Sequence, residues 1–408
     1  MNNQEDGLQA IIDQALVGMP EIGKWQRRFI GVLFSTMLLI QGRINFTTLS
    51  RHSELHRKTF RRGFQQTFDF ETFNINCIEQ RPVKGNMAAL IDASFVQKSG
   101  KQTPGLAQFY NSCINKTEKG LEISEIALLD CDTRQAYALS TRQTLDQEGQ
   151  TRFDFYAEHL KDTAKHFPSE LKYLLADGAY SKKDFVDSVC DLNLDMVGKL
   201  RADADLQYLF QGEQLPRGRH RKYNGKVYFD DLSCFDSEGE VATNLHVYSL
   251  TARHKTLKRT IKVTLLLNTS KKDKPTYILL FSTDTTLSGI QIVELYALRF
   301  QIEFLFRDAK QFTGLMHCQA RNLKALDFHF NASMSAVNLA KLDLQIKHHQ
   351  NRILSKQPDF VFSLASYKHS NFCQALLNRL LSNLDLKLTS NKVNLAFCDS
   401  LSFGTSEF

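Results

Sequence analysis

One segment of the chain combines four kinds of reactive side chain at helical spacing. It spans residues 296–310 and reads YALRFQIEFLFRDAK. At about 100° per residue, an arc of roughly 60° on one helix would hold Tyr296, Arg299, Glu303 and Lys310. A phenol, a guanidinium, a carboxylate and an ammonium would therefore share one face. The same pattern is also typical of a solvated face with an Arg–Glu pair at i,i+4, which is worth only about 0.2–0.5 kcal/mol.

The other side of this segment is apolar, which favours a helix that packs on a core. The residues on the neighbouring and opposite arc are Leu295, Leu298, Ile302, Leu305 and Ala309. An apolar stripe beside a polar one predicts an amphipathic helix.

Two short apolar runs elsewhere end in an aspartate. Residues 87–95 read MAALIDASF and contain Asp92, and residues 171–180 read LKYLLADGAY and contain Asp177. Apolar runs of this length predict buried strands. A single aspartate after a strand is usually turn chemistry. Two of them, together with Glu303 on a polar helical face, indicate a site that binds hard cations through oxygen ligands.

These residues resemble a known signature. The positions that carry the resemblance are Asp92, the Asp177-Gly-x-Tyr180 motif and the spacing Tyr296-x2-Arg299-x3-Glu303-x6-Lys310. This pattern is similar to the DDE transposases of bacterial insertion sequences, and specifically to the IS-four group with its Y-R-E-K signature. The resemblance covers roughly residues 85 to 325. It implies an enzyme that binds the terminal inverted repeats of its own element, cleaves DNA at the ends and joins the 3′-hydroxyls to target DNA.

The resemblance also assigns roles to the polar residues. Asp92, Asp177 and Glu303 would be the catalytic residues and metal ligands, and Tyr296, Arg299 and Lys310 would contact DNA. Three carboxylates held together repel one another unless they hold divalent cations, so we expect Mg²⁺, with Mn²⁺ as a substitute. Two such ions can activate a water or a 3′-hydroxyl and stabilise the leaving oxygen. A structural alternative is that Arg299 only orients Glu303.

The order of the predicted elements indicates an α/β fold. Strands over 87–95, 121–130 and 135–140 are followed by a helix over 152–167, the strand before Asp177, a helix over 182–192 and a strand over 196–200. Helices that alternate with strands predict a mixed sheet with helices on both faces. We expect adjacent central strands to bring Asp92 and Asp177 side by side. The resemblance implies that this core is RNase H-like (retroviral integrase-like), with a β-rich insertion and a helical DNA-binding domain before it.

We divide the chain into five parts on these patterns. They are a helical, helix-turn-helix-like region (1–80), the first part of the core (81–200), the β-rich insertion (201–285), the part of the core with the catalytic helix (286–325) and a helical C-terminal region (326–408). In the insertion we expect strands over 226–230, 245–249, 260–267 and 277–281. Helices over 323–349 and 364–386 either complete the core or form dimer contacts, and transposition requires two ends held together, as in a homodimer.

Two basic segments could contact DNA. Residues 45–64 predict a short helix, a polar break and a basic helix, with Phe60 and Phe64 facing inwards and four cations, Arg57, Lys58, Arg61 and Arg62, along one side. Residues 253–274 carry eight basic residues and one acidic residue. In both cases the alternative is an ordinary solvated surface.

One residue departs from the pattern of relatives that form DNA hairpins. Those relatives use a tryptophan in the insertion, whereas Trp25 is the only tryptophan of this chain. Tyr228, Phe229 or Phe281 would have to replace it, or the protein does not form hairpins.

Composition sets further limits. The 408 residues are 42% hydrophobic and carry a formal charge of +7, which gives a mild attraction to polyanions. The eight cysteines form no CxxC pair, so we expect reduced thiols in a bacterial cytoplasm or nucleoid and no structural zinc. We expect no signal peptide, because the first residues, MNNQED, lack a basic start and an apolar core. We expect no membrane partner, because the apolar run near residues 29–40 is too short to span a bilayer. Two other classes stay open: a metal-dependent nuclease without strand transfer, and a catalytically silent domesticated DNA-binding protein.

Overall fold

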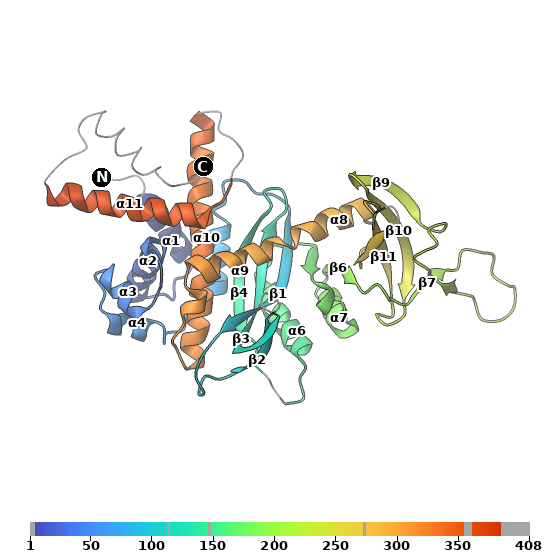
Figure 1. Cartoon of the computed structure of the whole chain (residues 1–408), viewed down its shortest axis with the longest axis horizontal. Coiled ribbons are helices and arrows are strands. Elements are labelled where there is room, and N and C mark those ends of the chain that lie inside the picture. Colours follow the sequence, from blue (N-terminus) through green and yellow to red (C-terminus); the bar gives the residue numbers. More distant parts are fainter. Residues whose placement is uncertain (1–4, 112–114, 146–147, 272–274, 355–360, 385–408) are drawn as a thin grey trace.

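The structure of the protein is a computed structural model. It describes residues 5–111, 115–145, 148–271, 275–354 and 361–384. The chain forms a mixed α/β structure in which one large sheet runs through the molecule and helices gather at one end of it (Figure 1). Within the described ranges, no helix has the length and apolar character that crossing a membrane would require.

The described residues contribute 12 strands to this sheet. Their order is β2-β3-β1-β5-β6-β12-β11-β10-β7-β8, with β4 paired to β3 and β9 paired to β10. The strands are β1 (Met87–Gln97), β2 (Ala107–Asn111), β3 (Lys116–Asp130), β4 (Gln135–Gln143), β5 (Tyr173–Ala176), β6 (Asp195–Leu200), β7 (Leu206–Leu209), β8 (Tyr223–Lys226), β9 (Asp236–Ala242), β10 (Leu245–His254), β11 (Arg259–Asn268) and β12 (Thr276–Ser282).

The centre of the sheet is parallel and its two sides are antiparallel. β1 runs parallel to β5, and β5 runs parallel to β6. β1 is antiparallel to β3, and β3 is antiparallel to β4. Strands 206–282 continue the same sheet through the antiparallel contact of β12 with β6. The strands predicted from the apolar runs at 87–95, 121–130 and 135–140 are confirmed, and so is the helical and strand pattern around residue 177.

Helices cover both faces of the first half of the sheet. α6 (Arg152–Thr163) packs on β3 and β4, where His159 bonds the hydroxyls of Ser124 and Ser140. α9 (Gln301–Phe312) packs on β1 and β4. Ser124, which contacts α6, pairs with Ala93 and therefore lies on the same face of the sheet. The next residue along β1, Asp92, points towards α9. Because side chains alternate along a strand, α6 and α9 lie on opposite faces. α7 (Lys183–Asp191) lies against β6.

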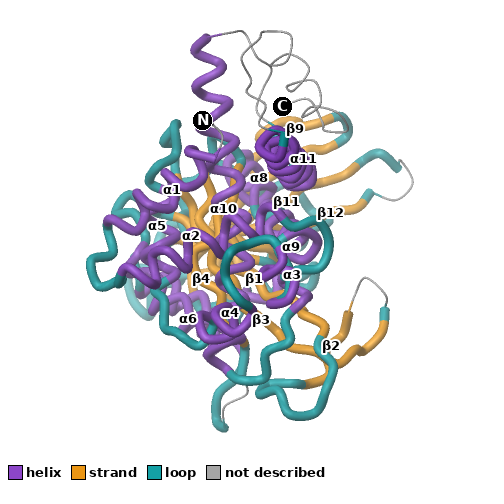
Figure 2. Tube along the Cα trace, turned by 90° about the vertical axis from the view of Figure 1, so that its left-hand side faces the viewer, coloured by secondary structure: helices purple, strands orange, loops and turns teal. Residues whose placement is uncertain are grey.

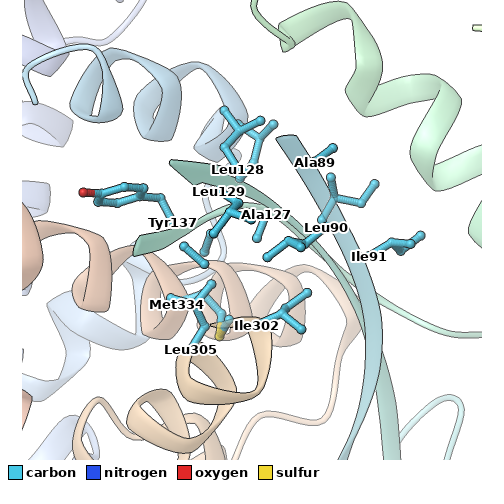
Figure 3. Close-up of a cluster of buried hydrophobic side chains, with 14 of the residues drawn as sticks. Ala89, Leu90, Ile91, Ala127, Leu128, Leu129, Tyr137, Ile302, Leu305 and Met334 are labelled. Atoms are coloured by element: carbon cyan, nitrogen blue, oxygen red, sulfur yellow. The ribbon is translucent and has the colours of Figure 1, made fainter. Parts of the chain in front are cut away.

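Apolar side chains fix α9 on the sheet. Figure 3 shows Ile302 and Leu305 of α9, with Met334 of α10 (Leu323–Leu354), facing apolar residues of β1 and β3 that include Leu90 and Ala127. All five residues are fully buried. A buried aliphatic side chain contributes roughly 1.5–3 kcal/mol to stability, so the contact that fixes the polar face of α9 is a strong one.

The remaining helices form a group around α10. This group consists of α1 (Glu5–Val17), α2 (Lys24–Leu39), α3 (Phe46–Arg51), α4 (Arg57–Gly63), α5 (Phe70–Ile78) and α11 (Leu364–Asn383). α1, α2, α5 and α11 all contact α10, and Figure 2 shows α1, α2 and α5 beside it. The predicted helical character of residues up to about 76 and of the two C-terminal segments is confirmed.

Two details of the predicted elements are wrong. A strand was expected over residues 226–230, but β8 ends at Lys226, because its ladder with β7 pairs residues 223–226 only. The single helix expected over 296–310 is interrupted: α8 (Gly289–Leu298) ends before Arg299, and α9 begins at Gln301.

Candidate active site

The parallel pair of strands β1 and β5 brings the two aspartates together. The ladder pairs Leu90 with Leu175 and ends with Ile91 opposite Ala176. Asp177 is the first residue after β5, whereas Asp92 lies within β1, which continues to Gln97 instead of ending at the aspartate; both follow the last pair of the ladder and so lie at the same level. The predicted juxtaposition is therefore confirmed. The side chain of Asp92 is 22% exposed, which leaves it open to a ligand from one side.

The interruption between α8 and α9 keeps the polar side chains on one front. Arg299 and Phe300 have right-handed helical dihedrals, and the backbone N–H groups of Arg299, Ile302 and Glu303 bond the carbonyl three residues earlier. This is the tighter 3₁₀ pattern. The chain is wound more tightly for one turn without leaving the helical path, so the expected common face survives the break.

Arg299 connects two of the three carboxylates. Its Nη2 donates to Oε1 of Glu303 at 2.9 Å, and its Nη1 lies 3.7 Å from Oδ2 of Asp92. The guanidinium is only 14% exposed. Within the part of the chain that the structure describes, its Nε has no hydrogen-bond partner. Arg299 thus serves as counter-ion to the carboxylates and retains one buried donor for an incoming acceptor.

Tyr296 and Lys310 complete the contacts of the polar face. The hydroxyl of Tyr296 donates to Oδ1 of Asp177 at 3.4 Å, and the Arg299 guanidinium lies over the Tyr296 ring, 5.7 Å from its centre. Lys310 donates from Nζ to the Ser94 hydroxyl at 2.8 Å. Ser94 lies two residues after Asp92, on the same face of β1. All four signature side chains therefore meet at β1 and the end of β5.

The electrostatics of the site show that the three carboxylates act on one another. The pKa of Asp92 is raised to about 6, mainly by burial and in smaller part by the charges of Asp177 and Glu303. The Ala93 N–H and the Arg299 guanidinium act in the opposite direction. Burial also raises the pKa of Tyr296, so its hydroxyl stays a neutral donor at neutral pH. The cluster is anionic and only partly compensated by one arginine.

The donor set suits a hard divalent cation. Carboxylate oxygens are the ligands that Mg²⁺ and Mn²⁺ prefer. Asp92 lies close enough to both other carboxylates for each of their charges to raise its pKa. Its oxygens could be shared between an ion held with Asp177 and another held with Glu303. With Arg299 between them, the oxygens of the three carboxylates are not all within 4.8 Å of one another. Among the described residues, only one set of three possible metal ligands meets this distance, and it is a different set.

That set consists of Asp69, Glu71 and His166, and its contacts explain it as a structural cluster. Asp69 caps α5 by accepting hydrogen bonds from the N–H and hydroxyl of Thr72. Glu71 accepts from the Ser140 hydroxyl at 2.6 Å and lies 3.2 Å from Nε2 of His166. These polar groups have protein partners and lie where the start of α5 meets the turn after α6.

The basic residues of the N-terminal region lie elsewhere in the molecule. α3 and α4 form with a break between them, as predicted, and Phe60 and Phe64 are buried. The four cations on and around α4 are all exposed: Arg57, Lys58, Arg61 and Arg62. Figure 1 shows α4 on the other side of α10 from β1, so the helix that carries these side chains lies apart from the strand that carries Asp92.

Two neighbours of Asp92, Ser94 and Glu125, were not among the residues that the sequence pattern predicted for the site. Ser94 anchors Lys310. Glu125 lies directly opposite Asp92 in the β1–β3 ladder, is fully buried and accepts a hydrogen bond from Thr141. Burial raises the pKa of Glu125 well above its usual range, against the opposing effect of the hydrogen bonds from Thr141 and the Leu139 N–H. Glu125 could have been found from the sequence, because it is a charged residue inside the apolar run 121–130.

A comparison with known protein families shows which family the chain belongs to. The sequence model of the family described as Transposase DDE domain matches residues 131–339, about half of the chain. The chain belongs to this family. No curated protein matches the sequence. The matched segment includes Asp177 and Glu303, and it begins after β1, which carries Asp92. The protein is therefore a transposase with a DDE domain, and this family binds DNA and generally uses a divalent metal.

Proposed function

We propose that this transposase belongs to the IS-four group of bacterial insertion sequences. It would bind the terminal inverted repeats of its element, cleave DNA at the ends and join the freed 3′-hydroxyls to target DNA. The observation that carries this proposal is the meeting of Asp92, Asp177 and Glu303 at the β1–β5 pair, with Tyr296, Arg299 and Lys310 around them. The complete Y-R-E-K spacing within one polar face supports the assignment to the group.

The sheet topology supports an RNase H-like core. The order β4-β3-β1-β5-β6, with an antiparallel meander followed by two parallel strands, is the arrangement expected of such a core. We retain the five proposed parts of the chain: residues 1–80, 81–200, 201–285, 286–325 and 326–408. The insertion would then be the strands β7 to β12, which leave the core after β6 and return to it at α8.

The three carboxylates would hold Mg²⁺, or Mn²⁺ in its place, with Asp92 as the shared ligand. Bound there, the metal would activate a water or a 3′-hydroxyl and offset charge on the phosphate in an in-line displacement. Asp177 and Glu303 flank Asp92, and the Tyr296 hydroxyl orients Asp177. In the metal-free protein, Arg299 compensates the charges that the metal would later compensate.

The other signature residues would contact DNA. Arg299 offers a forked guanidinium with one unpartnered buried donor, which suits a phosphate oxygen. Lys310 is a point charge beside β1, and the half-buried Tyr296 offers an aromatic face. The exposed Arg57, Lys58, Arg61 and Arg62 would bind phosphates of the terminal repeat. A homodimer would hold the two ends together during transposition.

The structure narrows the choice of an aromatic residue for a flipped base. Phe281 is fully buried in β12 and has no face free for stacking. Phe229 is half-buried and packs against Tyr277, with ring centres 5.9 Å apart. Tyr228 is 60% exposed. Trp25 lies in α2 and stacks on Phe29. If the pathway includes a hairpin, we expect Tyr228 to support it.

Cleavage and strand transfer on DNA that carries the element's own ends test this proposal. Wild type is compared with Asp92→Asn and Glu303→Gln, each of which removes one anionic ligand with little change of shape. Glu294→Gln is the matched control, because Glu294 is an exposed carboxylate on α8. We expect Mg²⁺-dependent cutting and joining by wild type and the control, and DNA binding without chemistry by the two variants.

Other outcomes would overturn the proposal in different ways. Cutting without joining or end preference would indicate a nuclease. DNA binding without cutting by any version would indicate a protein that has lost catalysis. Equal activity of Asp92→Asn and wild type would remove Asp92 from the site.

A further inference from the structure

A large basic cavity opens beyond the carboxylates along β1. Its volume is about 1130 Å³. Its walls are the end of β1 and the chain after it (residues 97–103), the first residues of β3 and the segment after α9 (residues 316–321). Arg43, which lies shortly before α3, also lines it. Its charged lining residues are five cations and one carboxylate: Arg43, Lys98, Lys101, Lys119, Arg321 and Glu118.

The cavity is built on a buried lysine. Lys98 is 8% exposed, and its Nζ donates to the carbonyls of Cys318 and Ala320 at 2.7 and 2.8 Å. These bonds tie the end of β1 to the segment after α9. Burial lowers the pKa of Lys98, and the nearby Arg321 lowers it further. Cations that crowd together in this way repel one another, which is offset when an anion binds between them.

The remaining cations are available to a ligand from solvent. Arg43, Lys101 and Arg321 are exposed. Lys119 is also exposed and donates to the Gly100 carbonyl. The single carboxylate, Glu118, accepts a hydrogen bond from Gln97. The lining therefore keeps a net positive charge in a concave surface wide enough for a phosphate backbone.

The position of the cavity relates it to the active site. Asp92, Ser94 and Lys98 lie on the same face of β1 and its continuation, because side chains alternate. Six residues separate Asp92 from Lys98, which is roughly 20 Å of extended chain at about 3.3 Å per residue. Duplex DNA that rises 3.4 Å per base pair covers this distance in about six base pairs. Lys310 lies between, bonded to Ser94.

We propose that this basic cavity binds the phosphate backbone of duplex DNA about six base pairs from the phosphate that lies at Asp92, Asp177 and Glu303. The inference rests on the proposed function, which places the cleaved phosphate at the three carboxylates so that the duplex can run from there along β1 to the cavity. It adds a DNA-binding surface that does not include the signature residues. Phosphates of the element's end and of the target DNA share this chemistry, and the experiment separates them.

The test is a charge reversal with a matched control. Lys101→Glu with Arg321→Glu changes the cavity by four charge units. Lys161→Glu with Lys165→Glu makes the same change at two exposed residues of α6 and the turn after it, on the opposite face of the sheet. Thermal melting establishes that each variant is folded. If the cavity pair does not fold, the neutral single variants Lys101→Gln and Arg321→Gln take its place.

The readout is DNA affinity as a function of salt, measured by fluorescence anisotropy without divalent metal. One duplex carries the repeat that flanks the gene, and the other is an unrelated duplex of equal length. The logarithm of the association constant falls linearly with the logarithm of salt concentration, and the loss of two phosphate contacts should make this negative slope shallower by about 1.8. Binding should also weaken roughly tenfold or more at moderate salt. The control pair should keep the slope of wild type.

Each outcome bears on the inference separately from the chemistry. A reduced slope on the flanking duplex alone assigns the cavity to the element's end, and on both duplexes it assigns the cavity to backbone binding in general. A reduced slope on the unrelated duplex alone assigns it to target DNA. An unchanged slope, or an equal loss in the control pair, overturns the inference even if wild type cuts and joins DNA. A reduced slope in a protein that never cuts leaves the cavity standing and rejects the proposed function.

Discussion

At the scale of single residues, the site is held in a state that suits binding rather than stability. Asp92 is half-buried beside two other carboxylates, and the cation paired with it is an arginine at 3.7 Å that also bonds Glu303. A pKa of about 6 means that Asp92 is ionised at pH 8 at a free-energy cost, because the unfolded chain ionises it more easily. The same cost is what a divalent cation would offset.

We therefore expect Asp92→Asn to stabilise the metal-free protein at pH 8 by about 1–2 kcal/mol. Each unit of pKa shift corresponds to about 1.4 kcal/mol, and the expected effect is smaller than this value summed over the whole shift because Asp92 is partly solvated. The sign follows from the raised pKa. Ionising Asp92 costs more free energy in the folded state than in the unfolded state, so the ionised carboxylate lowers the free energy of unfolding. Urea unfolding with a chelator measures the difference. A less stable Asp92→Asn variant under these conditions would show that the cluster is already well compensated.

Ser94 supports a second prediction at this scale. Its hydroxyl accepts a hydrogen bond from Lys310, so Ser94→Ala should misplace the ammonium without removing a charge. We expect strand transfer to slow about tenfold, the value of roughly 1.4 kcal/mol for one hydrogen bond to a charged group. Melting temperature should not change. Ser188→Ala on the surface of α7 is the control, and equal rates for the two variants would exclude a role for the Lys310 contact.

At the scale of elements, α10 protects the open edge of β4. Asn338 accepts from the Ala138 N–H and donates to its carbonyl, and Asn331 does the same for Thr141. Lys341 donates to the Ala136 carbonyl. Asn331 and Asn338 lie seven residues apart, two turns of a helix, so they follow the strand. An unpaired strand edge would otherwise invite pairing with another chain.

Asn338→Leu should therefore destabilise the fold. The change leaves the Ala138 N–H and carbonyl buried without partners, at a cost of about 1–3 kcal/mol for each group. We expect a total loss of about 2–4 kcal/mol in the free energy of unfolding, measured by chemical denaturation. Gln311→Leu on the exposed side of α9 is the control and should cost little. A near-neutral Asn338→Leu would mean that water can reach this edge.

Element patterns explain which parts of the structure the sequence predicts. The apolar runs that end at Asp92 and Asp177 predict β1, β5 and their adjacency, because parallel central strands meet at the same edge. The period of residues 296–310 predicts the polar face. The 3₁₀ turn at Arg299 and the Asn338–Ala138 bonds do not follow from local pattern, since the partners of α10 lie about 200 residues earlier in the chain. The same holds for the contact of Arg299 with Asp92.

At the scale of the whole molecule, one buried lysine joins three regions. Lys368 of α11 is 2% exposed, and its Nζ donates to the carbonyls of Met37 in α2 and Phe312 at the end of α9. The N-terminal helices, the helix that carries Glu303 and the C-terminal helix therefore meet at a single amine. Burial lowers its pKa to about 7. A neutral amine still has two N–H groups, enough for both carbonyls, so this junction is satisfied without a buried charge.

This arrangement makes the stability of the whole protein depend on pH. The folded pKa of Lys368 lies below its value of 10.5 in the unfolded chain, so the unfolded state binds more protons between about pH 7 and pH 10. Stability from this group therefore rises with pH across that window, by up to about 1.4 kcal/mol per pH unit. Below pH 7 the group is charged in both states and its contribution is flat.

Urea unfolding of wild type and Lys368→Met at pH 6.5, 7.5, 8.5 and 9.5 checks this, with steps of about one pH unit chosen to resolve the expected slope. Lys368→Met leaves two carbonyls without donors, so its absolute stability reports both that loss and the removed titration. The difference between the two proteins isolates the titration, and wild type should gain on the variant as pH rises. Parallel curves would mean that the amine stays charged at the junction and that the three regions are held together by an ammonium instead.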